Sequence, residues 1–215
     1  QFAAIDSADV VSKVVSSLSA LDGMEFNSKI HAINEIRKAL HAKSPFANEP
    51  VDCVLWIRSD SVHANDYNPN SVAPPEMKLL EHSIKEDGYT QPIVAWMNGE
   101  QFEVIDGFHR NRVGKESPIV NARVMGYLPI TIANDSRLDK GDRIASTIRH
   151  NRARGKHKVE AMSDIVIELK RRNWSDEKIG RELGMDADEV LRLCQITGLA
   201  EVDRKSTRLN SSHRT

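Results

Sequence analysis

The residues best placed to do chemistry stand in one short stretch, where an apolar segment ends in a turn. Phe102–Ile105 alternates like a strand and Asp106-Gly107 makes the turn. A basic segment of helical character follows, with His109, Arg110 and Arg112. A strand that turns at glycine into a helix leaves the first helical amides free, and the helix dipole favours an anion there. Because the basic side chains add donors, the stretch predicts a phosphate site, but an ordinary corner with solvated arginines fits it equally well.

A second basic cluster runs from Arg149 to Lys158, with five Lys or Arg, two His and no acid. The pattern of Asp139–Ile148 is helical, which places this cluster at a helix end or in the loop after it. A lone charge run is usually a solvated face. Two such clusters in one small protein, each with an Asn and a Gly, instead favour a clamp on a polyphosphate or a nucleic-acid backbone.

The composition is that of a globular protein without a global charge. The chain has 215 residues, 40% of them hydrophobic and 28% charged, and a formal net charge of −1. Any affinity for nucleotide or nucleic acid must therefore come from local clusters. Cys53 and Cys194 stand far apart in apolar segments, which indicates free thiols in a reducing cytoplasm rather than a disulfide or a metal site. The sequence has no run of 18 apolar residues and no leader-like opening, so we expect neither a membrane span nor secretion.

The chain is expected to divide into four parts. Residues 1–50 contain two helices and a linker, an extension that packs on the main domain or on a partner, with Asn27 and Ser28 as caps of its second helix. Residues 51–138 alternate short strands and helices, and residues 139–203 are helical. Residues 204–215 have no periodicity and resemble translated sequencing-adapter sequence, so we expect this tail to be non-native and the natural protein to be longer.

Residues 51–138 are expected to form a compact α/β unit, with the loop after Ile105 at its functional edge. A helix starts at Pro75 and ends near Gly88, and Asn98-Gly99 is a strong hairpin turn. Strands are predicted at Val51–Ile57, Gln91–Trp96, Phe102–Ile105 and Ile119–Met125.

The third part contains the spacing of a helix-turn-helix. Ser175 caps one helix, Gly184 ends it, and Asp186–Leu193 begins the next. The second helix opens with three acids, which would repel phosphates in the major groove, so a structural or protein-contact role competes with DNA binding. The basic residues offered for DNA are Arg171, Arg172 and Arg192.

Residues 60–200 resemble the ParB/sulfiredoxin family in the order of their motifs. A first box with Asn-Pro lies at Asn65–Asn70, and a helix ending at Gly88 leads to Gln91-Pro92-Ile93-Val94. The second box is Asp106–Arg112 and the third lies near Arg149–Arg154. Each box is short, but the combination is specific. The resemblance implies an α+β fold, a ParB/sulfiredoxin-like small mixed sheet with helices, followed by an all-α helix-turn-helix region.

The resemblance also implies what the boxes do. The second and third boxes would hold the phosphates of a nucleotide, CTP or ATP/ADP, with Mg²⁺ as a further candidate. The residues implied in phosphate binding are Gly107, Phe108, His109, Arg110, Arg112, Arg149, His150, Asn151, Arg152 and Arg154, with Asn68 and Pro69 in the first-box loop.

The chain departs from the family pattern at the second box. Phe108 stands where sulfiredoxins carry their reactive cysteine, so reduction of a sulfinic acid is not expected. Asp106–Arg110 also resembles the kinase branch that phosphorylates free serine, in which Asp106 and His109 would be the catalytic candidates. Arg149–His157 is closest to the prophage-associated branch of the regulator IbrB, whose members are linked to phage gene activation and accompany a PAPS-reductase-like protein. Carboxylates do not cluster, so a nuclease ranks low.

Three hypotheses follow for the function. The first is a nucleotide-binding regulatory protein associated with DNA, either a prophage or mobile-element transcription co-activator or a partition-like protein. The second is an enzyme of the same fold, an NTP hydrolase or a small-molecule kinase, and the third is a protein-interaction adaptor. The expected partners are a nucleotide, DNA, a PAPS-reductase-like protein and a second copy of the chain.

Overall fold

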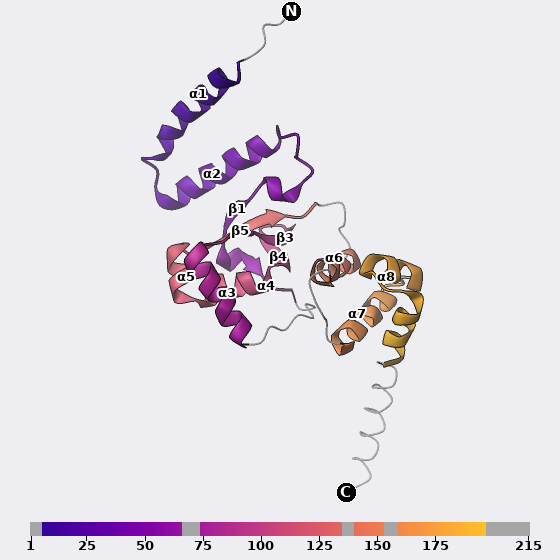
Figure 1. Ribbon diagram of the computed structural model, residues 1–215. Helices are drawn as coiled ribbons and strands as arrows, with labels where there is room; N and C mark the ends of the chain where they lie inside the picture. Colours follow the sequence, from indigo (N-terminus) through magenta and orange to yellow (C-terminus); the bar gives the residue numbers. More distant parts are fainter. Residues whose placement is uncertain (1–5, 66–73, 135–139, 153–158, 197–215) are drawn as a thin grey trace, which may run out of the picture.

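The computed structural model describes residues 6–65, 74–134, 140–152 and 159–196 (Figure 1). A five-stranded mixed sheet lies at the centre, a pair of helices precedes it, and a helical region follows it. The expected fold class, a small mixed sheet with helices followed by an all-α helix-turn-helix region, is confirmed. The domain boundary expected at 138/139 lies within residues 135–139, which the structure does not describe. The expected tail, residues 204–215, also lies outside the described residues.

The two helices expected near the N-terminus are present. Helix α1 (Ser7–Leu18) leads through the short turn η1 (Ser19–Leu21) to helix α2 (Phe26–His41). The predicted caps of α2 are wrong. Asn27 and Ser28 lie inside the first turn, and the cap is Glu25, whose carboxylate accepts from the Ser28 amide at 3.1 Å.

Helix α2 is tied to the edge of the sheet by one buried side chain. The Asn34 carboxamide accepts from the Trp56 amide at 3.0 Å and donates to the Trp56 carbonyl at 2.7 Å. These two bonds satisfy the free edge of the strand that contains Trp56, which would otherwise offer unpaired backbone groups. The extension therefore packs on the main domain through α2.

The sheet has the strand order β1-β5-β3-β4-β2. Strands β3 and β4 form an antiparallel hairpin that turns at Gly99, which has the positive φ (62°) that such a turn requires. Strand β5 runs parallel to β3 and antiparallel to β1, and β2 runs parallel to β4. The strands are β1 (Leu55–Arg58), β2 (Val62–His63), β3 (Ile93–Asn98), β4 (Gln101–Asp106) and β5 (Tyr127–Ile132), with short 3-10 turns η2 (Pro50–Asp52) and η3 (Ser59–Ser61) beside β1.

Three helices pack together beside the sheet: α3 (Pro74–Asp87), α4 (Phe108–Glu116) and α5 (Pro118–Arg123). Buried side chains of Ile84, Val113 and Val120 join them. Gly114 lets α4 approach the sheet closely, because a Cβ there would collide with Leu128 and Tyr89. This close approach fixes where the first turn of α4 lies.

The strand predicted at Ile119–Met125 is wrong. The β-branched residues of that segment suggested a strand, but Ser117 precedes the helix as its N-cap and Pro118 occupies its first turn. Helix α5 results, and the chain then turns through Met125 and Gly126, both with positive φ. The strand follows two residues later, at β5.

The C-terminal region is a helical unit with its own core. It contains α6 (Lys140–Arg152), α7 (Val159–Arg171), α8 (Asp176–Leu183) and a helical segment over 187–196. Gly184 adopts the left-handed conformation after α8 (φ 67°), and a Cβ on Gly180 would lie 2.8 Å from the Met185 carbonyl oxygen. The predicted helix-turn-helix is confirmed. The shared core consists of Ile144, Ala145, Ile148, Met162, Ile165, Val166, Leu169, Trp174, Ile179, Leu183, Met185, Val190 and Leu193.

Candidate phosphate-binding site

Helix α4 begins after Gly107, whose left-handed backbone conformation only glycine adopts without strain. Gly107 has φ 86° and ψ 25°, and its carbonyl accepts from the Asn111 amide at 2.8 Å. No side chain within the described ranges caps this helix. The amides of its first turn therefore remain available to an anion, as the strand-turn-helix pattern predicted.

Arg110 folds back over Gly107. A Cβ on Gly107 would lie 2.9 Å from an Arg110 guanidinium nitrogen, so a larger residue at this turn would displace the arginine. The guanidinium donates to Gln91 at 2.5 Å and pairs with the Asp106 carboxylate at 3.4 Å. Both partners of this ion pair are largely buried. The arginine is thus held in place beside the free amides, with a cationic group facing the turn.

Tyr89 supports the same turn from the strand side. Its hydroxyl donates to the Arg110 carbonyl at 3.0 Å. Burial raises the pKa of Tyr89 to about 12, so the hydroxyl keeps its proton across the physiological range. The contact fixes the backbone of the first turn rather than supplying a reactive group.

His109 lies on the side of α4 that faces α3. Neither of its ring nitrogens reaches the surface or a hydrogen-bond partner in the part of the chain that the structure describes. Burial lowers the pKa of His109, Arg112 lowers it further, and Glu76 opposes both effects. The imidazole is therefore neutral at pH 7, and a nearby phosphate would favour its protonation.

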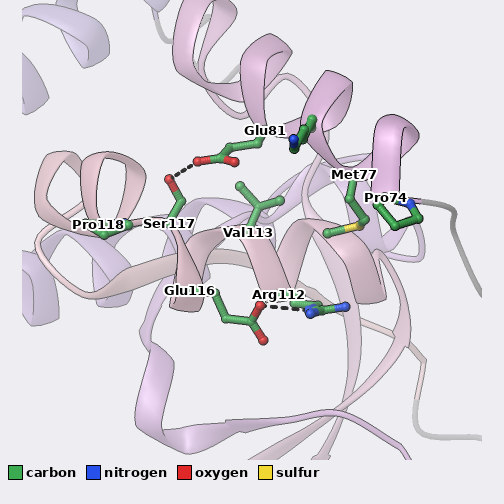
Figure 2. A pocket seen from close by; sticks show the side chains of 9 residues that line it. Pro74, Met77, Glu81, Arg112, Val113, Glu116, Ser117 and Pro118 are labelled. Atoms are coloured by element: carbon green, nitrogen blue, oxygen red, sulfur yellow. Dashed lines mark hydrogen bonds and ion pairs between the residues drawn. The ribbon is translucent and has the colours of Figure 1, made fainter.

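Arg112 points away from Arg110, because two residues along a helix are separated by about 200°. It pairs with Glu116 at 2.8 Å and lines a cavity of about 460 Å³ between α3 and the α4–α5 junction (Figure 2). Both members of this pair are more than half exposed, so the pair is weak and easily exchanged. The arginines of the second box thus serve two different surfaces.

Two buried asparagines at this corner were missed as site residues. The Asn65 amide group donates to the Val104 carbonyl at 2.6 Å, while its carbonyl oxygen is buried with no partner among the described residues. The side-chain carbonyl oxygen of Asn111 is also buried and has no partner among the described residues. One turn after Asn111, Lys115 donates to the Val62 carbonyl, so this side of α4 faces β2. Unsatisfied buried acceptors are costly, so a donor that reached these two oxygens would stabilise this corner.

The third box belongs to a helix that contacts the strand leading into the second box. Helix α6, which ends at Arg152, contacts β4 and so extends toward the same part of the sheet. The side chains of Arg149, His150, Asn151 and Arg152 lie outside the described residues, as do Arg154, Asn68 and Pro69. Thr147, on the described part of α6, has a fully buried hydroxyl without a hydrogen-bond partner in the described chain.

The three residues predicted for DNA have different surroundings. Arg171 is exposed at the end of α7, and Arg172 pairs with Glu168 at 2.8 Å. Arg192 donates to the Asp188 carbonyl at 3.2 Å on the second helix of the helix-turn-helix. Asp186 caps that helix by accepting from the Glu189 amide at 2.7 Å. Asp186 therefore has a structural role at the end that would enter a groove.

Neither a cluster of metal ligands nor a membrane-spanning helix is found among the described residues. Within the described ranges, no three His, Cys, Asp or Glu side chains gather in a way that could hold a metal ion. No helix there is long and apolar enough to cross a bilayer. Cys53 and Cys194 are free, half-buried thiols, and burial raises the pKa of each.

Comparison of the sequence with known proteins identifies the family of this chain. A model of the ParB N-terminal domain matches residues 46–126, and a model of the IbrB-like C-terminal HTH domain matches residues 157–205. The protein YbdM of Escherichia coli (strain K12), itself uncharacterized, is 56% identical over 185 residues, 85% of this chain and 87% of YbdM. This chain belongs to the YbdM family. The resemblance to ParB proteins and to the IbrB branch is confirmed, and a DNA-associated ParB-like protein is the corresponding general class.

Solved ParB structures resemble the YbdM-family chain loosely. C-terminally truncated ParB of Caulobacter crescentus matches in its complex with CTP-γ-S (TM-score 0.38, 17% identity, 74% of this chain and 88% of that one). The same protein on the centromeric parS site matches with a TM-score of 0.45 at 17% identity, over 74% and 79% of the two chains. A Pnob8-like ParB-N domain gives 0.44 at 14% identity, over 66% and 69%. The family assignment comes from the sequence matches.

Proposed function

We propose that this protein binds a nucleotide at the corner between β4 and α4, and that binding controls its contacts with DNA. The observation that carries the proposal is the start of α4. It opens at Gly107 with uncapped amides, beside Arg110 and next to two buried asparagine oxygens that have no partner among the described residues. Such a corner offers donors to phosphate and acceptors to the hydroxyl or amino groups of a sugar or base.

The proposed role of each residue depends on the direction in which its side chain points. The first-turn amides and Arg110 would hold the phosphates, and His109 would gain a proton beside them. Arg112 points away from Arg110, so it would bind only a phosphate group that extends around α4, after exchanging Glu116, which the weakness of that exposed pair permits. The third-box residues predicted from sequence, Asn151 and Arg152, would close the site from α6, the helix that contacts β4.

Binding without group transfer is the version that we favour. The enzymatic alternative makes Asp106 a base or a metal ligand, but its carboxylate already pairs with Arg110 at a buried position. This pairing suits a residue that positions the arginine. Release of inorganic phosphate from any nucleotide, lost in Asp106→Asn, would instead support the hydrolase hypothesis, and phosphorylation of an added small-molecule acceptor would support the kinase hypothesis.

The deciding experiment is calorimetric titration of the full chain with CTP, ATP, GTP and UTP, with and without Mg²⁺. We expect one nucleotide to bind, and Arg110→Ala to weaken it by about 10- to 100-fold, because a charge-assisted contact contributes roughly 1.5–3 kcal/mol. Arg181→Ala is the matched control, since Arg181 is an exposed arginine on α8. Equal affinities for the protein and for Arg110→Ala would contradict the proposal.

The DNA part of the proposal rests on the helix-turn-helix domain. We expect duplex binding to weaken with salt and to change when the nucleotide is present. Fluorescence anisotropy with a labelled duplex, with Arg171→Ala compared with the parent, measures both effects. Roles as a transcription co-activator or in partition, a PAPS-reductase-like partner and a cytoplasmic location stay predictions.

A further inference from the structure

The cavity of about 460 Å³ that Arg112 lines has matching walls on two helices. Each wall contributes one apolar, one basic and one acidic side chain. These residues are Met77, Lys78 and Glu81 on α3, and Val113, Arg112 and Glu116 on α4. Pro74 and Pro118 lie at the two ends of the cavity (Figure 2). The volume falls in the range of about 300–1,000 Å³ that is typical of small-molecule sites.

The acidic side chain of the α3 wall already has partners. The Glu81 carboxylate pairs with Lys85 at 2.7 Å and accepts from the hydroxyl of the buried Ser117 at 2.6 Å. These two contacts, that of the lysine first, hold the pKa of Glu81 below its usual value, so the carboxylate is ionised at neutral pH. Its charge is therefore matched on its own side of the cavity, and it does not call for a cationic ligand.

The positive charges around the cavity are less well matched. Lys78 is exposed and forms no ion pair with any described residue. Arg112 pairs with Glu116, but both side chains are more than half exposed, so an anion from solvent can replace the glutamate. Three cations, Lys78, Lys85 and Arg112, surround the cavity, against the two carboxylates of Glu81 and Glu116. The excess charge is positive.

The floor between these charges is apolar. Val113 is buried in the small core that joins α3, α4 and α5, and Met77 packs against that core. In Figure 2, Val113 lies between the Ser117–Glu81 hydrogen bond and the Arg112–Glu116 pair. A methionine side chain adapts its shape to an apolar ligand. A ligand can therefore cover this floor while its charged end stays at the rim.

We infer that this cavity binds a small amphipathic anion, an organic carboxylate with an apolar body that contains a ring. The ligand carboxylate replaces Glu116 on Arg112, because a planar guanidinium binds carboxylates through two parallel hydrogen bonds. Lys78 adds a second positive charge, and the apolar body lies on Val113 and Met77. A cationic ligand would add to the positive excess, and a neutral one would leave it unmatched. The site is distinct from the proposed nucleotide site, because Arg112 points away from Arg110.

Naphthylacetate is a suitable probe, titrated into the full chain while the Met77 methyl group is followed by NMR. Met77→Leu assigns that signal. We expect saturable shift changes with a dissociation constant of roughly 0.1–1 mM, as is typical of a ligand of this size. Naphthylacetamide, which has the same shape without the charge, should bind at least about tenfold more weakly. Equal affinities for the acid and the amide would overturn the inference.

Lys78→Glu and Arg112→Gln test the two cations. Each should weaken naphthylacetate binding at least about tenfold, and unchanged binding in both variants would overturn the inference. The matched control is Arg58→Gln, which removes an exposed arginine that pairs with Asp60 on β1, and it should leave binding unchanged. Because Lys78 is exposed, Lys78→Glu should not alter the thermal midpoint.

Lys78→Glu also separates the cavity from the nucleotide site. Nucleotide affinity should be the same in this variant and in the parent, because Lys78 is not among the residues proposed to hold phosphates. A parallel loss of nucleotide and naphthylacetate would show that the cavity is part of the nucleotide site, which overturns the inference. The naphthylacetate titration itself needs no nucleotide, so its outcome stands even if no nucleotide binds.

Discussion

The corner between β4 and α4 and the helix-turn-helix unit are built in opposite ways. At the corner, buried polar atoms of Asn65, Asn111 and His109 lack hydrogen-bond partners in the described chain. In the helix-turn-helix, Ser175 and Asp186 cap their helices and apolar residues fill the core, although α6 at the edge of that core buries the Thr147 hydroxyl without a partner among the described residues. Buried polar groups without partners lower stability, so a fold retains them where a ligand supplies the partner. The first region thus has the properties of a binding site and the second those of a scaffold.

The largest expected effect is on the scaffold. Leu183→Ala removes a fully buried side chain from the helix-turn-helix core, and we expect the free energy of unfolding to fall by about 3 kcal/mol. Chemical denaturation followed by circular dichroism measures it. If the two regions work separately, nucleotide affinity at low temperature should change less than about twofold. A proportional loss of affinity would mean that α6 couples them tightly.

Gly107→Ala should affect both stability and binding. The left-handed backbone and the nearby Arg110 guanidinium make a Cβ costly, by about 1–2 kcal/mol, and the displaced arginine should weaken nucleotide binding at least tenfold. Gly99→Ala is the matched control, because Gly99 also has a positive φ but lies in open space. Gly99→Ala should lower the thermal midpoint without changing the titration. Equal effects of the two substitutions on binding would argue against an anion site at Gly107.

Asn111→Leu separates a binding residue from a structural one. The unpartnered amide oxygen suggests that a leucine of similar volume would leave the free energy of unfolding unchanged within about 1 kcal/mol, or raise it. Nucleotide affinity should fall, because a polar contact of the ligand is lost. A large loss of stability without nucleotide would indicate that Asn111 instead stabilises the free protein.

The smallest expected effect is a pH dependence from His109. Its folded pKa is lowered, so the unfolded chain takes up the proton first as the pH falls through about 6.5, and stability decreases there. A bound polyphosphate raises that pKa, so binding should take up protons and strengthen by less than about tenfold between pH 7.5 and 6. Calorimetry in buffers of different ionisation enthalpy measures the uptake. His109→Gln should remove it, and an unchanged uptake in this variant would assign the proton to the nucleotide.

The local features of this protein follow from its amino-acid order. The glycine turn at Gly107, the hairpin at Gly99 and the cap at Ser175 follow from backbone preferences that act over a few residues. For the same reason most of the order of strands and helices was predictable. The exceptions are the short strand β2, which was not predicted, and α5, where a proline start outweighed β-branched residues and the strand came later, at β5. The similarity of the boxes to those of ParB proteins also needed only the order of residues.

Which groups share a site depends on packing between segments that are distant in the chain. The separation of Arg110 from Arg112 follows from the helix itself, but the surface that each arginine faces depends on how α4 sits on the sheet, and Gly114 sets that position by allowing the close approach to Leu128 and Tyr89. The burial of Asn65 and Asn111 depends on strands and helices that are distant in sequence. The exposure of the apolar side chains of α1 could not be predicted either, since an apolar pattern specifies a face to be covered but not what covers it.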